Sequence, residues 1–427
     1  MFRKTLFWIH LIAGVITGLV IALMSATGVA LAFEKELLAW AEKDAQVVAV
    51  PSEASARIPL DDLLKRFRSE NPEARPSAVT VSSKLDAAVA ITVGRDAVYY
   101  INPYTGEIRR PASTAMRDAL RKAEDAHRWL ALEGDGRTTG RAITGASNLA
   151  FLVLGVTGLY LWWPRQFTWR ALRPSIWFVG GAKAKAREWN WHNTIGFWTL
   201  PVLIVLTASG VVMSYRWANN LVYRFAGEAP PAIGGPGGPA GNAGGGAIEF
   251  PAPAAGARPA SYATHLATLE QTLPNWQTIT FRMAANRPNA PRAGSRSANS
   301  DTPQAGGPRS ANADTPRRGS ERRSVSPVTA MVRSQNEFPS FASTTVTLDP
   351  YTSAVLKKES LADATPGRRA RMWLRFLHTG EALGMTGKIL AALASLGGVF
   401  LVYTGFAMAI RRAANARRRR AAARGAV

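Results

Sequence analysis

The sequence predicts a mainly α-helical membrane protein: a four-helix transmembrane bundle made by tandem duplication, carrying two α+β modules outside the membrane. Three observations lead to this fold class: four long apolar stretches, the polar segments between them, and motifs that recur in the same order in both halves. Each apolar stretch reaches the ~20 residues that a helix needs to cross a bilayer. They are Leu6–Phe33, Ile143–Trp163, Trp191–Tyr215 and Lys388–Ile410.

Composition narrows the function classes before any motif is considered. The chain has 427 residues, 52 of them basic and 29 acidic, with 5 histidines and no cysteine. The missing cysteines exclude a disulfide scaffold, a thiol nucleophile, a cysteine-ligated zinc or iron–sulfur centre and covalently attached c-type haem. The apolar stretches exclude a soluble globule.

The basic residues predict how the spans are oriented. Arg3 and Lys4 precede the first span, residues 164–190 between the second and third are basic, and residues 411–427 carry seven arginines without an acid. By the positive-inside rule all three segments are cytoplasmic, so both termini lie inside and the long connections outside. The net charge of +23 therefore indicates topology and lipid contact, with no nucleic acid as partner. The first apolar run exceeds that of a signal peptide, so we interpret it as an uncleaved helix.

Internal repeats support the duplication. The first and third spans share the pattern H-x3-G-x13-G, and the second and fourth share Thr-Gly followed ten residues later by Gly. In the connections, Asn102–Ile108 matches Asp349–Val355. The first follows the alternating, strand-like runs Ala88–Val93 and Val98–Ile101, and the second follows the run Thr344–Leu348. The residues of the four span motifs are His10, Gly14 and Gly28, then His192, Gly196 and Gly210, then Thr144, Gly145 and Gly155, and Thr386, Gly387 and Gly397.

Two low-complexity stretches interrupt the second exterior module. Gly227–Arg258 is rich in Gly, Ala and Pro, and Asn286–Pro327 in Ser, Arg and Pro, so we expect disordered insertions. The predicted organisation is: 1–36, first span; 37–120, first exterior module; 121–163, pre-helix and second span; 164–190, basic loop; 191–216, third span; 217–370, second exterior module; 371–410, pre-helix and fourth span; 411–427, Arg-rich tail.

Four of the five histidines fall at matching depths in this topology. His10 and His192 lie near the inner ends of the first and third spans, and His127 and His378 just before the second and fourth. Ionisable groups at membrane depth are costly and usually have a functional partner, and the core of a four-helix bundle can hold a cofactor. We expect two ligand pairs. His265 breaks the pattern, and we predict a surface residue there.

Two imidazoles per site suit haem b, which supplies its other four ligands from its own ring. Zinc needs more protein ligands, and copper usually recruits Cys or Met. The sequence therefore predicts two bis-histidine haem b groups, an arrangement that favours electron transfer. Arginines near each pair are candidates to bind the haem propionates. They are Arg128, Arg141, Arg371 and Arg375 at the outer site and Arg187 at the inner site.

The chain resembles the PepSY-associated transmembrane helix family, which includes iron-regulated membrane proteins of the ferric-siderophore reductase type. Trp8–Gly14, Trp191–Asn193 and the Asn/Asp-Pro-Tyr-Thr turns carry the resemblance. It implies a multi-pass protein of the bacterial inner membrane with two periplasmic PepSY modules. It also implies that His10, His127, His192 and His378 ligate haem.

Three functions remain open at this stage. The first is reduction of a periplasmic ferric siderophore, with a quinol or a separate reductase as electron donor because no nucleotide-binding motif is visible. The second is a non-redox PepSY protein that binds peptides or regulates a periplasmic protease. The third is a transporter subunit for iron or a siderophore.

Overall fold

The computed structural model describes most of the chain: residues 1–52, 56–94, 97–164, 166–231, 257–283, 326–335 and 337–424. The two predicted insertions, Gly227–Arg258 and Asn286–Pro327, lie almost entirely outside these residues.

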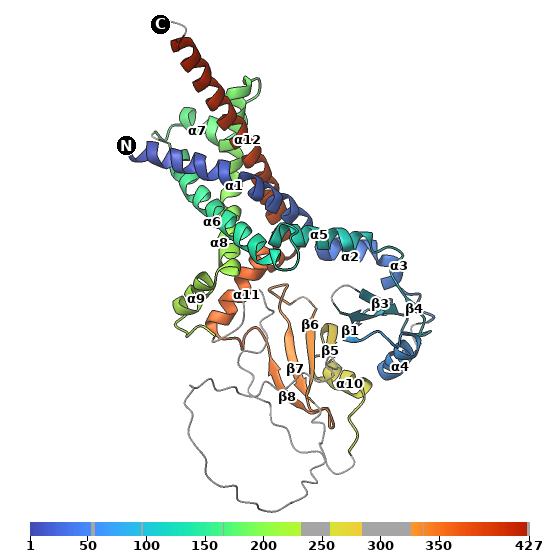
Figure 1. Ribbon diagram of the computed structural model, residues 1–427. Helices are drawn as coiled ribbons and strands as arrows, with labels where there is room; N and C mark the ends of the chain where they lie inside the picture. Colours follow the sequence, from blue (N-terminus) through green and yellow to red (C-terminus); the bar gives the residue numbers. More distant parts are fainter. Residues whose placement is uncertain are drawn as a thin grey trace, which may run out of the picture.

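Four helices within the described residues are long and apolar enough to span a membrane. They are α1 (Phe2–Ala32), α6 (Gly136–Trp162), α8 (Ala184–Ser214) and α12 (Gly384–Arg424). Both α1 and α8 pack against α6 and α12, so α1 and α8 occupy opposite corners of the bundle. The beginning of α1 and the end of α12 lie at the end of the bundle away from the sheet (Figure 1). We call this the terminal end and the opposite one the sheet end.

Shorter helices continue the spans at both ends. At the sheet end lie α2 (Glu34–Ala41), α3 (Lys43–Gln46), α5 (Ala115–Trp129), α9 (Arg216–Phe225), α11 (Pro366–His378) and the 3-10 turn η1 (Glu381–Leu383). At the terminal end lies α7 (Trp169–Ile176), between α6 and α8. Helix α5 packs on α1 and α6, and α11 packs on α8 and α9. Helix α5 therefore contacts two of the spans, and α11 contacts one of them.

The connections outside the bundle build one antiparallel sheet of eight strands in the described part of the chain. Its order is β4-β3-β2-β1-β5-β6-β7-β8, so the chain's two halves meet where β1 pairs with β5. The strands are β1 (Pro76–Ser82), β2 (Val89–Val93), β3 (Ala97–Ile101), β4 (Ile108–Arg109), β5 (Trp276–Arg282), β6 (Val328–Ser334), β7 (Thr344–Leu348) and β8 (Val355–Glu359).

Alternation along these strands explains the core of the sheet. One face carries buried apolar side chains such as Val79, Ile91, Phe281 and Val346, while the other is rich in threonine. Two amphipathic helices, α4 (Leu60–Glu70) and α10 (Tyr262–Thr272), contribute Phe67 and Leu269 to the same cluster. The core therefore runs across both halves of the sheet.

His265 is buried, contrary to the surface position predicted for it. The side chain is 1 % exposed, and its Nδ1 lies 2.8 Å from Oγ of Ser353. Ser353 has a φ of 60°, at the place in its turn that Gly106 occupies in the first half. On α4 the residue at the same helical position is the apolar Leu63. The polar neighbours of His265 in sequence suggested exposure, but its helical face points into the sheet core.

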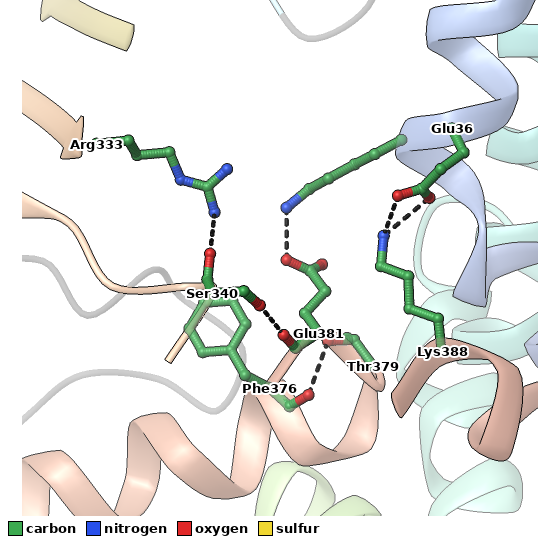
Figure 2. Close-up of polar contacts among 8 residues, drawn as sticks. Glu36, Arg333, Ser340, Phe376, Thr379, Glu381 and Lys388 are labelled. Atoms are coloured by element: carbon green, nitrogen blue, oxygen red, sulfur yellow. Dashed lines mark hydrogen bonds and ion pairs between the residues drawn. The ribbon is translucent and has the colours of Figure 1, made fainter. Parts of the chain in front are cut away.

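A polar junction joins the sheet to the bundle where α11 meets α12 (Figure 2). The Ser340 hydroxyl, in the connection from β6 to β7, donates to the backbone carbonyl of Glu381. Lys35 pairs with the Glu381 carboxylate at 2.5 Å. Lys388 is buried and donates to both carboxylate oxygens of Glu36, at 2.7 and 2.8 Å. Burial raises the pKa of Glu36, but the hydrogen bond and charge of Lys388 outweigh it and lower that pKa overall.

Candidate functional site

The first histidine pair lies across the bundle near its terminal end. His10 comes from α1 and His192 from α8, and their ring centres are 6.4 Å apart with the rings at 80° to each other. Helices α1 and α8 occupy opposite corners, so the two imidazoles meet across the bundle interior. The structure thus brings together the two residues that the sequence paired.

The second pair lies at the sheet end. His127 stands in the last turn of α5, and His378 is the last residue of α11. Their ring centres are also 6.4 Å apart, with the rings at 70°. Both pairs therefore have the same spacing, although one comes from spans and the other from the helices that precede spans.

The spacing within each pair suits a single metal ion between the rings. Two metal–imidazole bonds of about 2 Å each, extended to the ring centres, span about 6.2 Å. Within the described residues no group of three His, Cys, Asp or Glu side chains is placed to hold a bare metal ion. The pairs therefore fit a metal that brings further ligands of its own, as a porphyrin iron does.

Each imidazole is oriented by a hydroxyl from another helix. The Nδ1 of His10 lies 2.9 Å from Oγ1 of Thr157 in α6, and that of His192 lies 2.9 Å from Oγ1 of Thr404 in α12. At the sheet end the same distances are 2.9 Å from His127 to Thr27 Oγ1 and 3.1 Å from His378 to Ser209 Oγ. The Nδ1 of His378 also lies 2.8 Å from the carbonyl oxygen of Leu206.

The direction of these hydrogen bonds follows from the hydroxyls. Each one donates its proton to a carbonyl four residues earlier on its own helix, at 2.6–2.8 Å. Its oxygen can then only accept, so Nδ1–H of the imidazole must be the donor. The free lone pair is left on Nε2, which is the arrangement that metal-ligating histidines commonly have.

A glycine follows each of these hydroxyl residues, so each span places one Thr/Ser-Gly dipeptide beside a histidine. A Cβ added to Gly158 would lie 3.4 Å from Cε1 of His10, and one added to Gly28 would lie 3.6 Å from Cε1 of His127. The backbone of one helix thus approaches the imidazole of another. The dipeptides are Thr27-Gly28, Thr157-Gly158, Ser209-Gly210 and Thr404-Gly405.

The turn after each sheet-end histidine is fixed by a close backbone contact. A Cβ at Gly387 would lie 2.2 Å from the carbonyl oxygen of Gly380, and one at Gly140 would lie 2.1 Å from that of Trp129. Gly380 and Trp129 each stand two residues after the histidine. Gly140 therefore has the structural role of Gly387, which the sequence comparison had given to Gly145. That prediction matched Thr144-Gly145 with Thr386-Gly387, but Gly145 packs against Tyr215, whereas Gly387 packs against the backbone of Gly380.

A cavity of about 1070 Å³ encloses the pair at the terminal end. Its walls are mostly apolar and come from all four spans, with His10 and His192 on opposite sides. Towards the terminal end, however, the lining becomes basic. The volume is at the upper end of the range found for small-molecule and cofactor sites. The basic lining residues are Lys183, Lys185, Arg411, Arg412 and Arg419.

The five arginines proposed for propionates lie in different surroundings. The Arg371 guanidinium donates to Asn219 at 2.8 Å, and burial lowers its pKa. Arg128 pairs with Glu124 at 2.5 Å. Arg141 lies 3.5 Å from the carbonyl oxygen of Met213, Arg375 lies over Phe376, and Arg187 lies over Trp191, outside the lining of the cavity.

The comparison with protein families agrees with this architecture. The family described as the PepSY-associated TM region matches residues 7–412. The chain belongs to this family. Its match includes all four histidines of the two pairs and all four Thr/Ser-Gly dipeptides. No curated protein compared with the chain gives a significant match.

The hydroxyl residues are the part of the site that sequence reasoning missed. The sequence of this PepSY-associated chain contains only a partial signal: each span holds one of these dipeptides, but α1, α6 and α12 hold further Thr-Gly dipeptides, such as Thr17-Gly18 and Thr144-Gly145. Threonine and glycine next to each other in a membrane helix also serve ordinary helix packing. Only the arrangement of the helices shows that an imidazole lies beside each of the four hydroxyls, whereas the space beside Gly210 is filled by Asn148.

Proposed function

We propose that this member of the PepSY-associated family is a di-haem b electron-transfer protein of the bacterial inner membrane that reduces periplasmic ferric chelates such as siderophore-bound iron. The observation that carries the proposal is the geometry of the two pairs: imidazoles 6.4 Å apart, each with its Nδ1–H engaged and its Nε2 free. When bound, haem b supplies a one-electron redox centre to each pair.

The chain's own residues hold each centre in place. The four Nε2 atoms would hold the two haems, and the hydroxyls of Thr27, Thr157, Ser209 and Thr404 keep the imidazoles in the tautomer that leaves Nε2 free. With two histidines available to each haem, the protein would leave no ligand position for oxygen or substrate. This favours passage of electrons over oxygen chemistry.

The separation of the pairs suits transfer across a membrane. On α1, His10 belongs to one site and Thr27 to the other, and they lie about 25 Å apart along the helix axis at 1.5 Å per residue. On α8, His192 and Ser209 have the same separation. A bilayer's hydrocarbon core is about 30 Å thick, so one site would serve each leaflet.

The orientation is also part of the proposal. The basic loop and tail would lie in the cytoplasm with both termini, and the sheet in the periplasm as two joined PepSY modules. The symmetrical strand order about the β1–β5 pair supports their origin by tandem duplication. A quinol or a separate reductase would supply the electron, and the ferric chelate would accept it, Fe(III) becoming Fe(II).

Spectroscopy of histidine variants tests the proposal. Purified protein should contain two haems per chain with low-spin bis-histidine spectra. His10→Ala and His192→Ala should each lose the same half of the pigment, and His127→Ala and His378→Ala the other half.

Double variants provide the internal control. Removing both histidines of one pair should cost no more pigment than removing one, whereas removing one from each pair should cost nearly all of it. Wild-type protein without haem, or four variants that lose pigment without this grouping, would contradict the proposal.

A further inference from the structure

The basic end of the cavity is lined by five cationic side chains, which differ in whether a carboxylate already neutralises them. Lys183 and Lys185 stand at the start of α8, and Arg411, Arg412 and Arg419 in the last part of α12. Such a cluster beside an apolar chamber suits a flat apolar ligand with an acidic edge. Which cation would bind that edge depends on which is already neutralised.

Arg411 is already neutralised. Its Nε and Nη2 donate to the two carboxylate oxygens of Glu188, both at 2.8 Å, and Glu188 is buried. A bidentate pair of this kind uses the planar fork of the guanidinium. Arg411 therefore fixes α12 to α8 and has little capacity for a further anion.

Arg412 is positioned differently. Its guanidinium carbon lies 4.9 Å from the ring centres of both Phe7 and Trp8 on α1. Within the described residues no carboxylate pairs with Arg412. Aromatic faces orient a guanidinium through cation–π attraction without using its N–H donors. The guanidinium group of Arg412 is thus held in a fixed orientation at the cavity and carries a charge that no carboxylate of the described residues neutralises.

The cavity end of α1 connects this arginine to the histidine pair. Phe7 stands three residues before His10, so the two side chains lie on the same face of α1, and both line the cavity. Phe7, whose ring the guanidinium faces, thus stands about one helical turn from His10 along α1. Arg187, by contrast, lies 5.7 Å from the ring centre of Trp191 and is not among the lining residues.

We infer that Arg412 binds a propionate carboxylate of the macrocycle held by His10 and His192, in the role that the sequence suggested for Arg187. This inference rests on the proposed function. Phe7 and Trp8 act as positioning residues, because they orient the guanidinium and touch no carboxylate themselves. Arg411 stays with Glu188.

The test measures haem loss from the purified full-length protein to excess apomyoglobin. Arg412→Gln should release one of the two haems about tenfold faster, the size expected for a lost charge-assisted hydrogen bond. Arg412→Lys should fall between this variant and the wild type. Arg187→Gln is the matched control and should match the wild type. The other haem, held by His127 and His378, should be unaffected in every variant and reports that the bundle is intact.

An esterified ligand separates this inference from lipid effects. Protein reconstituted with iron protoporphyrin IX dimethyl ester has no carboxylates to offer, so wild type and Arg412→Gln should release it at equal rates. A difference that persists with the ester would show that Arg412 acts through lipid or packing, and would overturn the inference. So would equal release of ordinary haem by both proteins, or faster release from Arg187→Gln. Wild-type protein that contains no haem would instead refute the proposed function itself.

Discussion

Replacing Thr404 by valine is the sharpest test of how the imidazoles are held. Valine has the shape of threonine but lacks the oxygen that accepts the Nδ1–H of His192 at 2.9 Å. The buried donor would be left without a partner, and the ring could change its tautomer or rotate. Outer-shell partners of metal-ligating histidines typically contribute 10- to 100-fold in affinity, or about 1.4–2.7 kcal/mol. We expect Thr404→Val to weaken haem binding at that pair by this factor.

The assay is haem dissociation, combined with the electron paramagnetic resonance signal of each low-spin haem. Thr404→Ser should restore binding, because it returns the accepting oxygen. Thr199→Val is the matched control: the Thr199 hydroxyl also donates to a carbonyl four residues earlier, Ile195, at 2.7 Å, but no imidazole contacts it. If Thr404→Val and Thr199→Val behave alike in rate and spectrum, the hydroxyl does not position His192 and our reasoning is wrong.

Two further predictions concern stability. Burial lowers the pKa of His265, so in acid the unfolded protein binds a proton at this residue that the folded protein excludes. The midpoint of thermal unfolding should therefore fall as the pH drops below about 6.5, the ordinary pKa of an imidazole. His265→Leu combined with Ser353→Gly, which copies the first half of the sheet, should make that pH dependence shallower, and an unchanged slope would contradict the reasoning. Glu36→Gln should destabilise the protein by about 2 kcal/mol in chemical unfolding, because it removes the negative charge that neutralises the buried ammonium group of Lys388. Adding Lys388→Met should recover most of this loss; no recovery would show that the pair is not the cause.

Much of the fold could be predicted because membrane insertion imposes a strong pattern. Long apolar runs located all four spans, although the helices extend further: α12 continues to Arg424, beyond the predicted end at Ile410. Polar helix ends carry no hydropathy signal, so their length escaped prediction. The strand-like runs at Ala88–Val93, Val98–Ile101 and Thr344–Leu348 form strands β2, β3 and β7. The other five strands of the described sheet were not predicted: β4 has only two residues, but β1 and β5 alternate as clearly as β7.

The pairing of the histidines could be predicted because topology assigns each one a depth. Their partners could not, since nothing in sequence places Thr157 beside His10 or Thr404 beside His192. Contacts between helices depend on rotation about each helix axis, which an apolar run leaves undetermined. The burial of His265 was missed for a related reason: it depends on which face of α10 meets the sheet.

The shared sheet has a mechanical consequence for the sheet-end histidines. In the described chain, β4 and β8 are the two edge strands of the eight-stranded sheet, and each is followed by a helix, α5 or α11. His127 and His378 therefore stand on helices that are connected to opposite edges of the same sheet. Slipping the β1–β5 seam by a single residue would displace one half by about 3.3 Å relative to the other. That is half the 6.4 Å gap between the rings. The register of these two central strands therefore has to agree with the packing of α5 on α1 and α6 and of α11 on α8, which places the two imidazoles in the bundle.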